Sequence, residues 1–413
     1  MRRVLITGLG IVSSIGRSKA DVVRSLVDGR SGIDRIPEMK ELGFRCTVGG
    51  TVKSSHATDS RIPRKYAQTM SDAARFAACA ALEALQDAGL AVSDVKSERA
   101  AVVVGGSFGG MNEAIRLHRA FMAHKTPSRL GIVGAVRIMG STASANLASM
   151  LGLQGSACSI CSSCSSGIDN IGVAYDMIAN GRADVCLCGS AEERTWMHVG
   201  AYFDNWSGMP TAWNERPEKA CRPYDRDRDG TVFSEGAGIL IAEELELALG
   251  RNARPYAEIV GYGSANDGAD MFQPDGVGVR ECLMQAISGA AERGVYEIDY
   301  INSHATGTRC GDAVEAAMIA QTWGSVGPPV SSVKGLIGHA MGAAGAIEAV
   351  LTLLMLEHGF IAPTANLEHV SDDCAQIQHV QTLIRRPIET ALKLSSGLGG
   401  TNACLVFQKW KAA

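Results

Sequence analysis

Residues 155–180 of the chain read GSACSICSSCSSGIDNIGVAYDMIAN. Small residues fill the run up to Cys164, and apolar residues then recur at helical spacing from Ile168 to Ile178. We therefore expect a helix that begins at or near Cys164. A cysteine at a helix N-terminus lies near unpaired backbone N–H groups, which lower the thiol pKa and favour the nucleophilic thiolate. The stretch predicts that Cys164 is a nucleophile.

Two other interpretations of this stretch stay open on spacing alone. In the first, most of the twelve cysteines are small buried hydrophobic residues. In the second, Cys158, Cys161 and Cys164 form the C-x2-C-x2-C run of an iron–sulfur protein. The fourth cluster ligand would fall at Ile168 and no proline follows, so the spacing disfavours a metal site.

The composition is typical of a soluble α/β protein. With 413 residues, 46% hydrophobic and 20% charged, the chain can bury a large core in one large or two fused domains. A formal charge of −4 argues against nucleic-acid binding. No run reaches the roughly 18 consecutive apolar residues of a membrane span. The cysteine spacing, without a secretory signal, indicates the reducing cytoplasm.

Strands and helices alternate along both halves of the chain. In the first half we expect strands at 4–7, 100–104, 185–188 and 238–242, with a glycine turn after the first strand and a long helix over 64–88. In the second half we expect strands at 256–262, 300–303 and 330–333, helices at 279–294, 312–322 and 341–357, and a final hairpin of 391–396 with 403–407. This rhythm predicts two βα-type halves packed together, residues 1–253 and 254–413.

Reactive side chains follow three of these expected strands. His304 lies in NSHATGT, Lys334 and His339 lie in SSVKGLIGH, and the last strand ends in GLGGTN. Strand ends are where sites are built in α/β sheets. Two histidines and a lysine there, together with Cys164, predict an enzyme with a thiol nucleophile.

These stretches resemble the β-ketoacyl-acyl carrier protein synthases, and among them the bacterial type I enzymes of fatty-acid elongation. The resemblance covers essentially the whole chain, from ITGLGIVSSIG through RDRDG and NSHATGT to GGTNA. It implies a thiolase-like fold of five αβαβα layers, a homodimer, and transfer of acyl groups carried on the phosphopantetheine of an acyl carrier protein. It implies no metal and no redox cofactor, because decarboxylation itself drives carbon–carbon bond formation.

The resemblance also implies a role for each matching residue. Cys164 carries the acyl chain as a thioester, and the backbone N–H groups of Cys164 and Leu398 form an oxyanion hole. His304 and His339 hydrogen-bond the malonyl thioester oxygen while decarboxylation builds enolate charge. The remaining matches are Lys334, which orders the site, Glu348 as its partner, and Thr306 and Thr308 on the phosphopantetheine arm.

The chain departs from the family pattern around the nucleophile. Leu398 stands where the family's GFGG gate has its phenylalanine. Ser396 replaces the aromatic residue before that gate, and Thr231 replaces the aromatic residue after RDG. These changes remove three rings, which loosens the gate and enlarges the chamber. Phe108 lies where relatives carry Gly or Ile at the base of the acyl pocket, and it shortens the tunnel. Together they predict a specialised synthase with a short or unusual acyl primer.

The resemblance places a basic docking patch for the acidic carrier protein at Arg64 and Lys65, with second contacts at Lys125 and Arg129. An alternative function is a non-elongating partner subunit or malonyl decarboxylase within a heterodimer. The altered gate favours that alternative, whereas the intact set of Cys164, two histidines and Lys334 argues against it.

Overall fold

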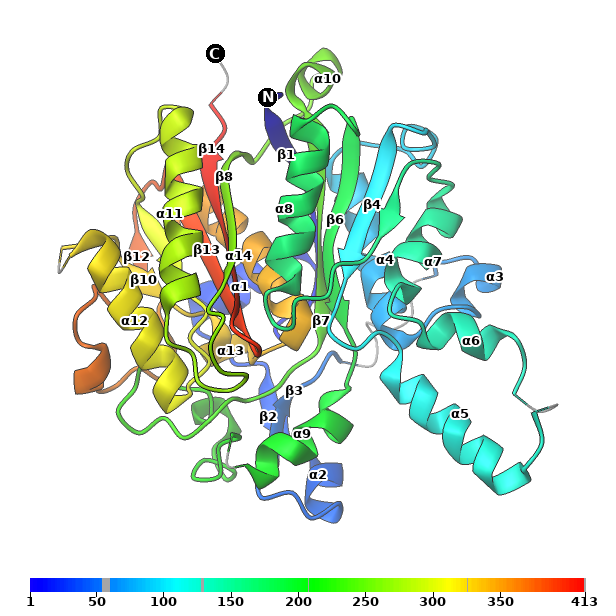
Figure 1. The fold of residues 1–413 in the computed structure, drawn as a ribbon, viewed down its shortest axis with the longest axis horizontal. Helices are drawn as coiled ribbons and strands as arrows, with labels where there is room; N and C mark the ends of the chain where they lie inside the picture. Colours follow the sequence, from blue (N-terminus) through cyan, green and yellow to red (C-terminus); the bar gives the residue numbers. More distant parts are fainter. Residues whose placement is uncertain (54–59, 128–129, 207, 325, 412–413) are drawn as a thin grey trace.

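The computed structural model describes residues 1–53, 60–127, 130–206, 208–324 and 326–411. Its centre is a mixed sheet of ten strands in the order β10-β9-β13-β14-β8-β1-β7-β6-β4-β5 (Figure 1). The first half of the chain contributes β1 (Val4–Val12), β4 (Ala100–Gly105), β5 (Ala157–Cys158), β6 (Val185–Glu192) and β7 (Gly236–Glu244). The second half contributes β8 (Ala257–Asn266), β9 (Tyr300–Asn302), β10 (Val330–Ser331), β13 (Thr390–Gly397) and β14 (Thr401–Lys409).

The two halves repeat one topology. When the five strands of each half are numbered along the chain, both halves have the order 3-2-4-5-1, read from the outer edge of the sheet to its centre. The three strands at each outer edge are parallel, and the two inner strands are antiparallel to their neighbours. The halves meet where β1 pairs with β8, with Leu5 opposite Glu258 and Ile6 opposite Ala257. The sheet therefore consists of two half-sheets with equivalent edges.

Helices form three layers around these half-sheets. Helices α4 and α7 cover the outer face of the first half-sheet, α11 and α12 cover that of the second, and α8 and α14 pack between the two (Figure 1). The expected five-layered αβαβα arrangement is confirmed. The bounds of the longer helices are α1 (Lys19–Asp28), α4 (Asp72–Asp87), α5 (Met111–His124), α7 (Thr142–Leu151), α8 (Ser166–Ala179), α9 (Trp196–Asn205), α11 (Val277–Glu292), α12 (Arg309–Trp323) and α14 (Ala344–His358).

Shorter elements connect this core. The short helices are α2 (Pro37–Glu41), α3 (Arg64–Ala67), α6 (Val133–Ile138), α10 (Leu245–Gly250) and α13 (Lys334–Ile337). Two small sheets pair β2 (Ile33–Arg35) with β3 (Val48–Gly50) and β11 (Phe360–Ile361) with β12 (Ile384–Arg385). Among the described residues, one helical stretch, Met341–His358, is long and apolar enough to cross a membrane, but 89% of it is buried inside the protein. Its apolar character is explained by its place in the middle layer.

The first strand is longer than the sequence predicted. The expectation of a strand at 4–7 followed by a glycine turn is wrong, because β1 continues through both glycines to Val12. A Cβ at Gly8 would lie 2.2 Å from the Ala84 carbonyl oxygen, and one at Gly10 would lie 1.8 Å from that of Ala80. The glycines therefore let α4 lie directly on the strand rather than turn the chain.

The long helix expected over 64–88 is two helices, so that prediction is also wrong. Helix α3 ends at Ala67, and α4 begins at Asp72. The Ser71 side chain accepts a hydrogen bond from the Ala74 N–H at 3.2 Å, which caps the second helix. Serine is a preferred N-cap residue, since its oxygen pairs one of the otherwise unpaired N–H groups.

Replacing Gly10 by alanine should destabilise the protein by about 1–3 kcal/mol, because the added methyl group has no space between β1 and α4. Gly250→Ala is the matched control, because an added Cβ there meets no heavy atom within 4 Å in the described part of the chain. Thermal denaturation of both variants measures the difference. Equal midpoints for the two variants would contradict the close approach of α4 to β1.

Candidate active site

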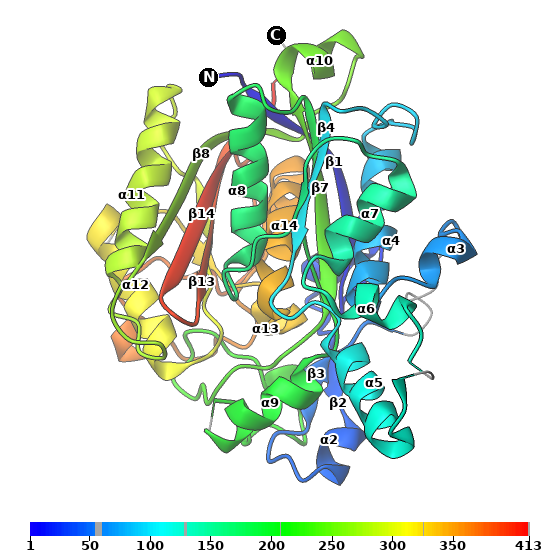
Figure 2. The same cartoon turned by 45° about the vertical axis from the view of Figure 1, so that its right-hand side comes forward.

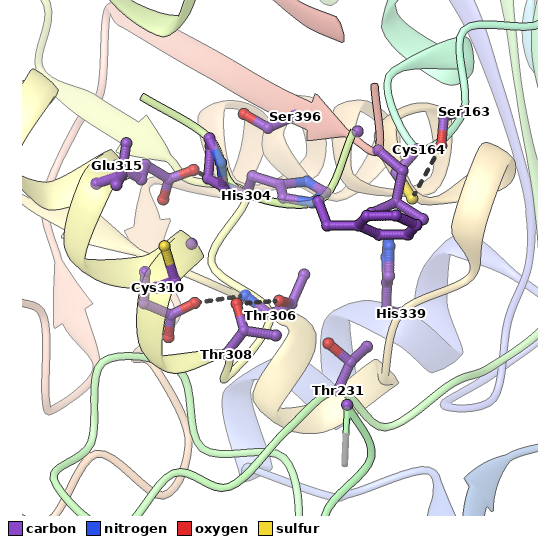
Figure 3. Close-up of a pocket in the computed structure, with 18 of the residues that line it drawn as sticks. Ser163, Cys164, Thr231, His304, Thr306, Thr308, Cys310, Glu315, His339 and Ser396 are labelled. Carbon is purple, nitrogen blue, oxygen red and sulfur yellow. Dashed lines mark hydrogen bonds between the residues drawn. The ribbon is translucent and has the colours of Figure 1, made fainter. Parts of the chain in front are cut away.

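Cys164 lies at the connection between the short edge strand β5 and helix α8. Ser163 before it has a φ of 55°, in the left-handed region that non-glycine residues rarely adopt. The turn places the Cys164 side chain on a cavity of about 600 Å³, shown in Figure 3. Helix α8 begins at Ser166, two residues later, so the prediction of a helix start near Cys164 is confirmed.

The β13–β14 turn closes over this cysteine. The Leu398 backbone N–H donates a hydrogen bond to the Cys164 sulfur. A Cβ at Gly397 would lie 2.9 Å from the Cys164 backbone nitrogen, so the two backbones are in direct contact. The N–H groups of Cys164 and Leu398 thus lie beside the same sulfur atom, although they come from different halves of the chain.

His304 follows β9 on a loop that two carboxylates of α12 hold. Glu315 accepts hydrogen bonds from the backbone N–H of His304 at 2.8 Å and of Ala305 at 3.1 Å. Asp312 accepts from Thr306 at 3.0 Å and from Gly307 at 3.2 Å. Because both carboxylates are buried, these four hydrogen bonds to the backbone fix the conformation of the loop.

His339 is held by the segment that precedes β7. Its backbone N–H donates to the Val232 carbonyl at 2.7 Å, and its carbonyl accepts from the Ser234 N–H at 2.9 Å. Its ring stacks on Phe233 with centroids 6.3 Å apart and lies edge-on to the His304 ring at 5.2 Å. The two imidazoles therefore form one unit on the cavity wall (Figure 3).

Both imidazoles are electrically neutral at ordinary pH. Burial lowers the pKa of each well below 6.5, and the positive charges of Lys334 and Lys393 lower it further. The Nδ1 atoms of both rings are buried and have no hydrogen-bond partner among the described residues. A neutral imidazole carries one N–H donor and one acceptor, so each ring can donate a hydrogen bond into the cavity.

Lys334 and Glu348 form a buried ion pair, the pairing that the resemblance implied. The structure adds a residue that the sequence analysis missed. Lys393 of β13 is also fully buried, and its Nζ lies 2.8 Å from the second oxygen of Glu348. A lysine between two leucines of the expected strand, ALKLSS, was the available signal, because a buried lysine needs a charged partner.

The expectation of a lowered thiol pKa at Cys164 is wrong. Burial raises the pKa of Cys164 to about 11, and the nearby Glu192 carboxyl adds to this effect. Ser163, Lys334 and the Leu398 N–H each lower the pKa, but they do not offset the loss of solvent. The Cys164 side chain is therefore a neutral thiol at ordinary pH.

All the residues expected to contact substrate line the same cavity. They are Phe108, Thr231, Thr306, Thr308, Ser396 and Leu398. Four aromatic rings that were not predicted from the sequence also line the cavity. Trp206 and Phe272 meet edge to face with centroids 5.0 Å apart, and Phe203 and Phe233 do so at 5.1 Å; all four line the cavity.

The expected docking residues lie on the side of the first half. Arg64 and Lys65 are exposed on α3, and Lys125 is exposed at the end of α5 (Figure 2). Arg129 lies outside the described residues. Within the described part of the chain, no group of three His, Cys, Asp or Glu side chains is placed to hold a metal ion.

Comparison with known proteins shows the family of this chain. The family model of the β-ketoacyl synthase N-terminal domain matches residues 1–248, and that of the C-terminal domain matches residues 256–368. The chain belongs to the β-ketoacyl synthase family. The 3-oxoacyl-[acyl-carrier-protein] synthase 1 of Haemophilus influenzae is 40% identical to it over 99% of this chain and 100% of the relative. The protein of the same name from Escherichia coli K12 is 41% identical over 100% of both chains.

Solved structures of the β-ketoacyl synthase family share this fold. A β-ketoacyl synthase from Burkholderia phymatum superposes with a TM-score of 0.93 at 32% identity and covers 100% of both chains. The ishigamide ketosynthase/chain length factor superposes with a TM-score of 0.90, also at 32% identity, over 99% of this chain and 100% of that one. The thiolase-like fold class predicted from the sequence is confirmed.

The raised pKa of Cys164 has a direct consequence for its alkylation. The rate of reaction with iodoacetamide should rise about tenfold per pH unit between pH 7 and pH 9, because only the thiolate reacts and its fraction grows in that proportion below the pKa. Mass spectrometry of the Cys164 peptide measures the rate, with Cys164→Ala as the blank. A plateau reached below pH 8 would show instead that the thiol is activated in the resting protein.

Proposed function

We propose that this chain catalyses the decarboxylative condensation of an acyl group on Cys164 with a malonyl group on an acyl carrier protein. The observation that carries the proposal is the common cavity of Cys164, His304 and His339, with the Leu398 N–H directed at the nucleophile. One nucleophile, one pair of backbone donors and two neutral imidazoles are the groups that thioester exchange and enolate chemistry need.

In the first half-reaction, the Cys164 sulfur attacks the thioester of the acyl carrier protein. The tetrahedral oxyanion is stabilised by the N–H groups of Cys164 and Leu398. The carrier's phosphopantetheine sulfur leaves and takes up a proton, while the Cys164 thiol loses one. Because the resting thiol is neutral, its proton must depart as the bond to sulfur forms.

In the second half-reaction, the malonyl carboxylate leaves as carbon dioxide, and its electron pair forms an enolate. His304 and His339 donate hydrogen bonds to the thioester oxygen where the negative charge develops. The enolate carbon attacks the carbonyl of the acyl group on Cys164. The Cys164 sulfur leaves as a thiolate, takes a proton from water, and frees the 3-oxoacyl chain on its carrier protein. No metal or redox cofactor is required by this sequence of steps.

The cavity lining supports a short or unusual acyl primer. Phe108 and Cys164 line the same cavity, and we propose that the Phe108 ring limits the depth available to a straight chain. Trp206 and Phe272, which are in edge-to-face contact, are exposed by 56% and 57% and also line the cavity. Aromatic surface of this kind packs well against a flat acyl group. We propose a dedicated pathway rather than bulk fatty-acid synthesis.

A homodimer in the cytoplasm is part of the proposal. Strand β5 is the last strand of the sheet, and its outer edge has no strand partner among the described residues. Helix α5 has no buried residue, and Phe121 and Met122 are exposed on it. An open strand edge and exposed apolar side chains are each suited to association with a second chain. The twelve cysteines are free, which is typical of proteins in a reducing compartment.

A heterodimer with a non-elongating role is the second candidate. The absence of aromatic rings at Leu398, Ser396 and Thr231 favours this second candidate, because a gate without these rings controls the ordered entry of the two substrates less well. The presence of the full set of Cys164, His304, His339 and Lys334 favours the condensing enzyme. Size-exclusion chromatography with light scattering on the purified chain separates a homodimer from a monomer that needs another partner.

The proposed function is tested by product analysis. Purified protein incubated with acyl- and malonyl-carrier proteins should give a 3-oxoacyl-carrier protein two carbons longer than the primer, detected by mass spectrometry. His304→Ala and His339→Ala should still form the acyl-Cys164 thioester but lower condensation by about 100-fold, because each loses a donor to the developing charge. Carbon dioxide release without a longer product from the unaltered chain would support the non-elongating alternative.

The primer hypothesis has its own test at Phe108. Phe108→Ala should shift the preferred primer toward longer saturated chains, by about tenfold in kcat/KM for the longest chain accepted, because the ring no longer blocks the cavity. Competition between acyl-carrier proteins of different length measures the preference. If the unaltered protein already extends long saturated chains as readily as short ones, the hypothesis of a short or unusual primer is wrong.

A further inference from the structure

Lys393 is a buried cation inside the second half-sheet. Its side chain has no exposed surface, and its Nζ lies 2.8 Å from Oε2 of Glu348. The same Nζ donates to the backbone carbonyls of Ser303 at 3.1 Å and of Asn302 at 3.4 Å, and also to that of Leu394. These contacts connect β13 with the end of β9, at the residue directly before His304.

Two amines form ion pairs with the single carboxylate of Glu348, and Glu315 is a further buried carboxylate whose charge acts on Lys393 without an ion pair. Lys334 pairs with one oxygen of Glu348 and Lys393 pairs with the other, so two amines share one buried carboxylate. A buried carboxylate with a single amine would already be neutralised. The second amine therefore adds a positive charge close to the imidazoles, and both lysines lower the pKa of His304 and of His339.

We propose that Lys393 is a positioning residue for the condensation step, which holds the His304 loop through the carbonyls of Asn302 and Ser303 and adds a positive charge behind the two imidazoles. This inference rests on the proposed function. A positive charge near hydrogen-bond donors stabilises an anion that they bind, and because the Lys393 amine is buried, its charge is only weakly screened. The developing enolate oxygen is such an anion, whereas formation of the acyl thioester on Cys164 depends on the backbone donors on the other side of the cavity.

The proposed role of Lys393 makes the condensation step depend on pH, because the amine can lose its proton. The charged and titratable groups around its amine are Glu348 of α14, Lys334 of α13, Glu315 of α12, Tyr300 of β9, His304 and His339. Burial lowers the pKa of Lys393 to about 8, against the opposing effect of Glu348. The amine is therefore charged below pH 8 and loses its proton above it, so the support that it gives to the condensation step declines as the pH rises through that value.

The test separates the two half-reactions. Enzyme with a preformed acyl-Cys164 thioester is mixed with malonyl-carrier protein in single turnovers from pH 6.5 to 9.5, and thioester formation is followed in parallel. Lys393→Met removes the amine but leaves Glu348 paired with Lys334, so no buried carboxylate loses its last partner. Lys409→Met is the matched control, because Lys409 of β14 also donates to a backbone carbonyl, that of Leu356 at 2.8 Å, away from the cavity.

We expect condensation by the unaltered enzyme to fall above about pH 8. Lys393→Met should condense about tenfold more slowly at pH 7 and show no fall near pH 8, while its thioester formation stays within about twofold of the unaltered enzyme. Lys409→Met should match the unaltered enzyme in both half-reactions. A purely structural role of Lys393 would not remove the dependence on pH.

Three results would overturn the inference. The first is a Lys393→Met enzyme with the condensation rate and pH profile of the unaltered one, and the second is equal slowing of both half-reactions. The third is an unaltered enzyme whose condensation does not change near pH 8, which is decisive even if Lys393→Met does not fold. If the unaltered enzyme forms the thioester but no 3-oxoacyl product at any pH, the proposed function itself fails, and the role of Lys393 fails with it.

Discussion

The buried carboxylate of Glu348 is the interaction on which the site depends. It projects from α14 in the middle layer and pairs with Lys334 of α13 and Lys393 of β13, all three side chains having no exposed surface. An ion removed from water costs several kcal/mol unless it is paired, and loss of one partner from a buried pair typically costs about 3–5 kcal/mol. The positions of α13, α14 and β13 are therefore fixed relative to one another by charge as well as by packing.

The helices of the middle layer also connect these ion pairs to Cys164. Helix α8, which follows Cys164, lies against α14 so closely that a Cβ at Gly167 would lie 2.3 Å from the backbone nitrogen of Ala346. Glu348 lies two residues further along α14, so the helix that holds the lysines also supports the cysteine. The N–H of Leu398 reaches the Cys164 sulfur from the end of β13, the strand that carries Lys393. Cys164 of one half and the two histidines of the other thus line one cavity above the same buried layer.

Much of this arrangement was predictable from the sequence, since short apolar runs and the residues that follow them are local signals. These signals predicted the strands before His304 and Lys334 and the final hairpin. They also predicted the alternation of strands and helices and the reactive residues that follow the strands. What failed depends on contacts distant in sequence. The path of β1 through Gly8 and Gly10 depends on α4 packed on it, and the thiol pKa of Cys164 depends on how much solvent the fold removes. The position of Lys393 between two leucines indicated a buried amine, but its partner could not be predicted, because Glu348 lies 45 residues away in the sequence.

The central claim is that Glu348 holds both sides of the site, and hydrogen–deuterium exchange of Glu348→Gln tests it most directly. Glu357→Gln on the same helix is the control, because that side chain is 44% exposed. The account predicts faster amide exchange in α13, in β13 and in the loop that carries His304, with the control unchanged, since two buried lysines lose their shared counter-charge. Unchanged exchange in these segments of Glu348→Gln would contradict the claim.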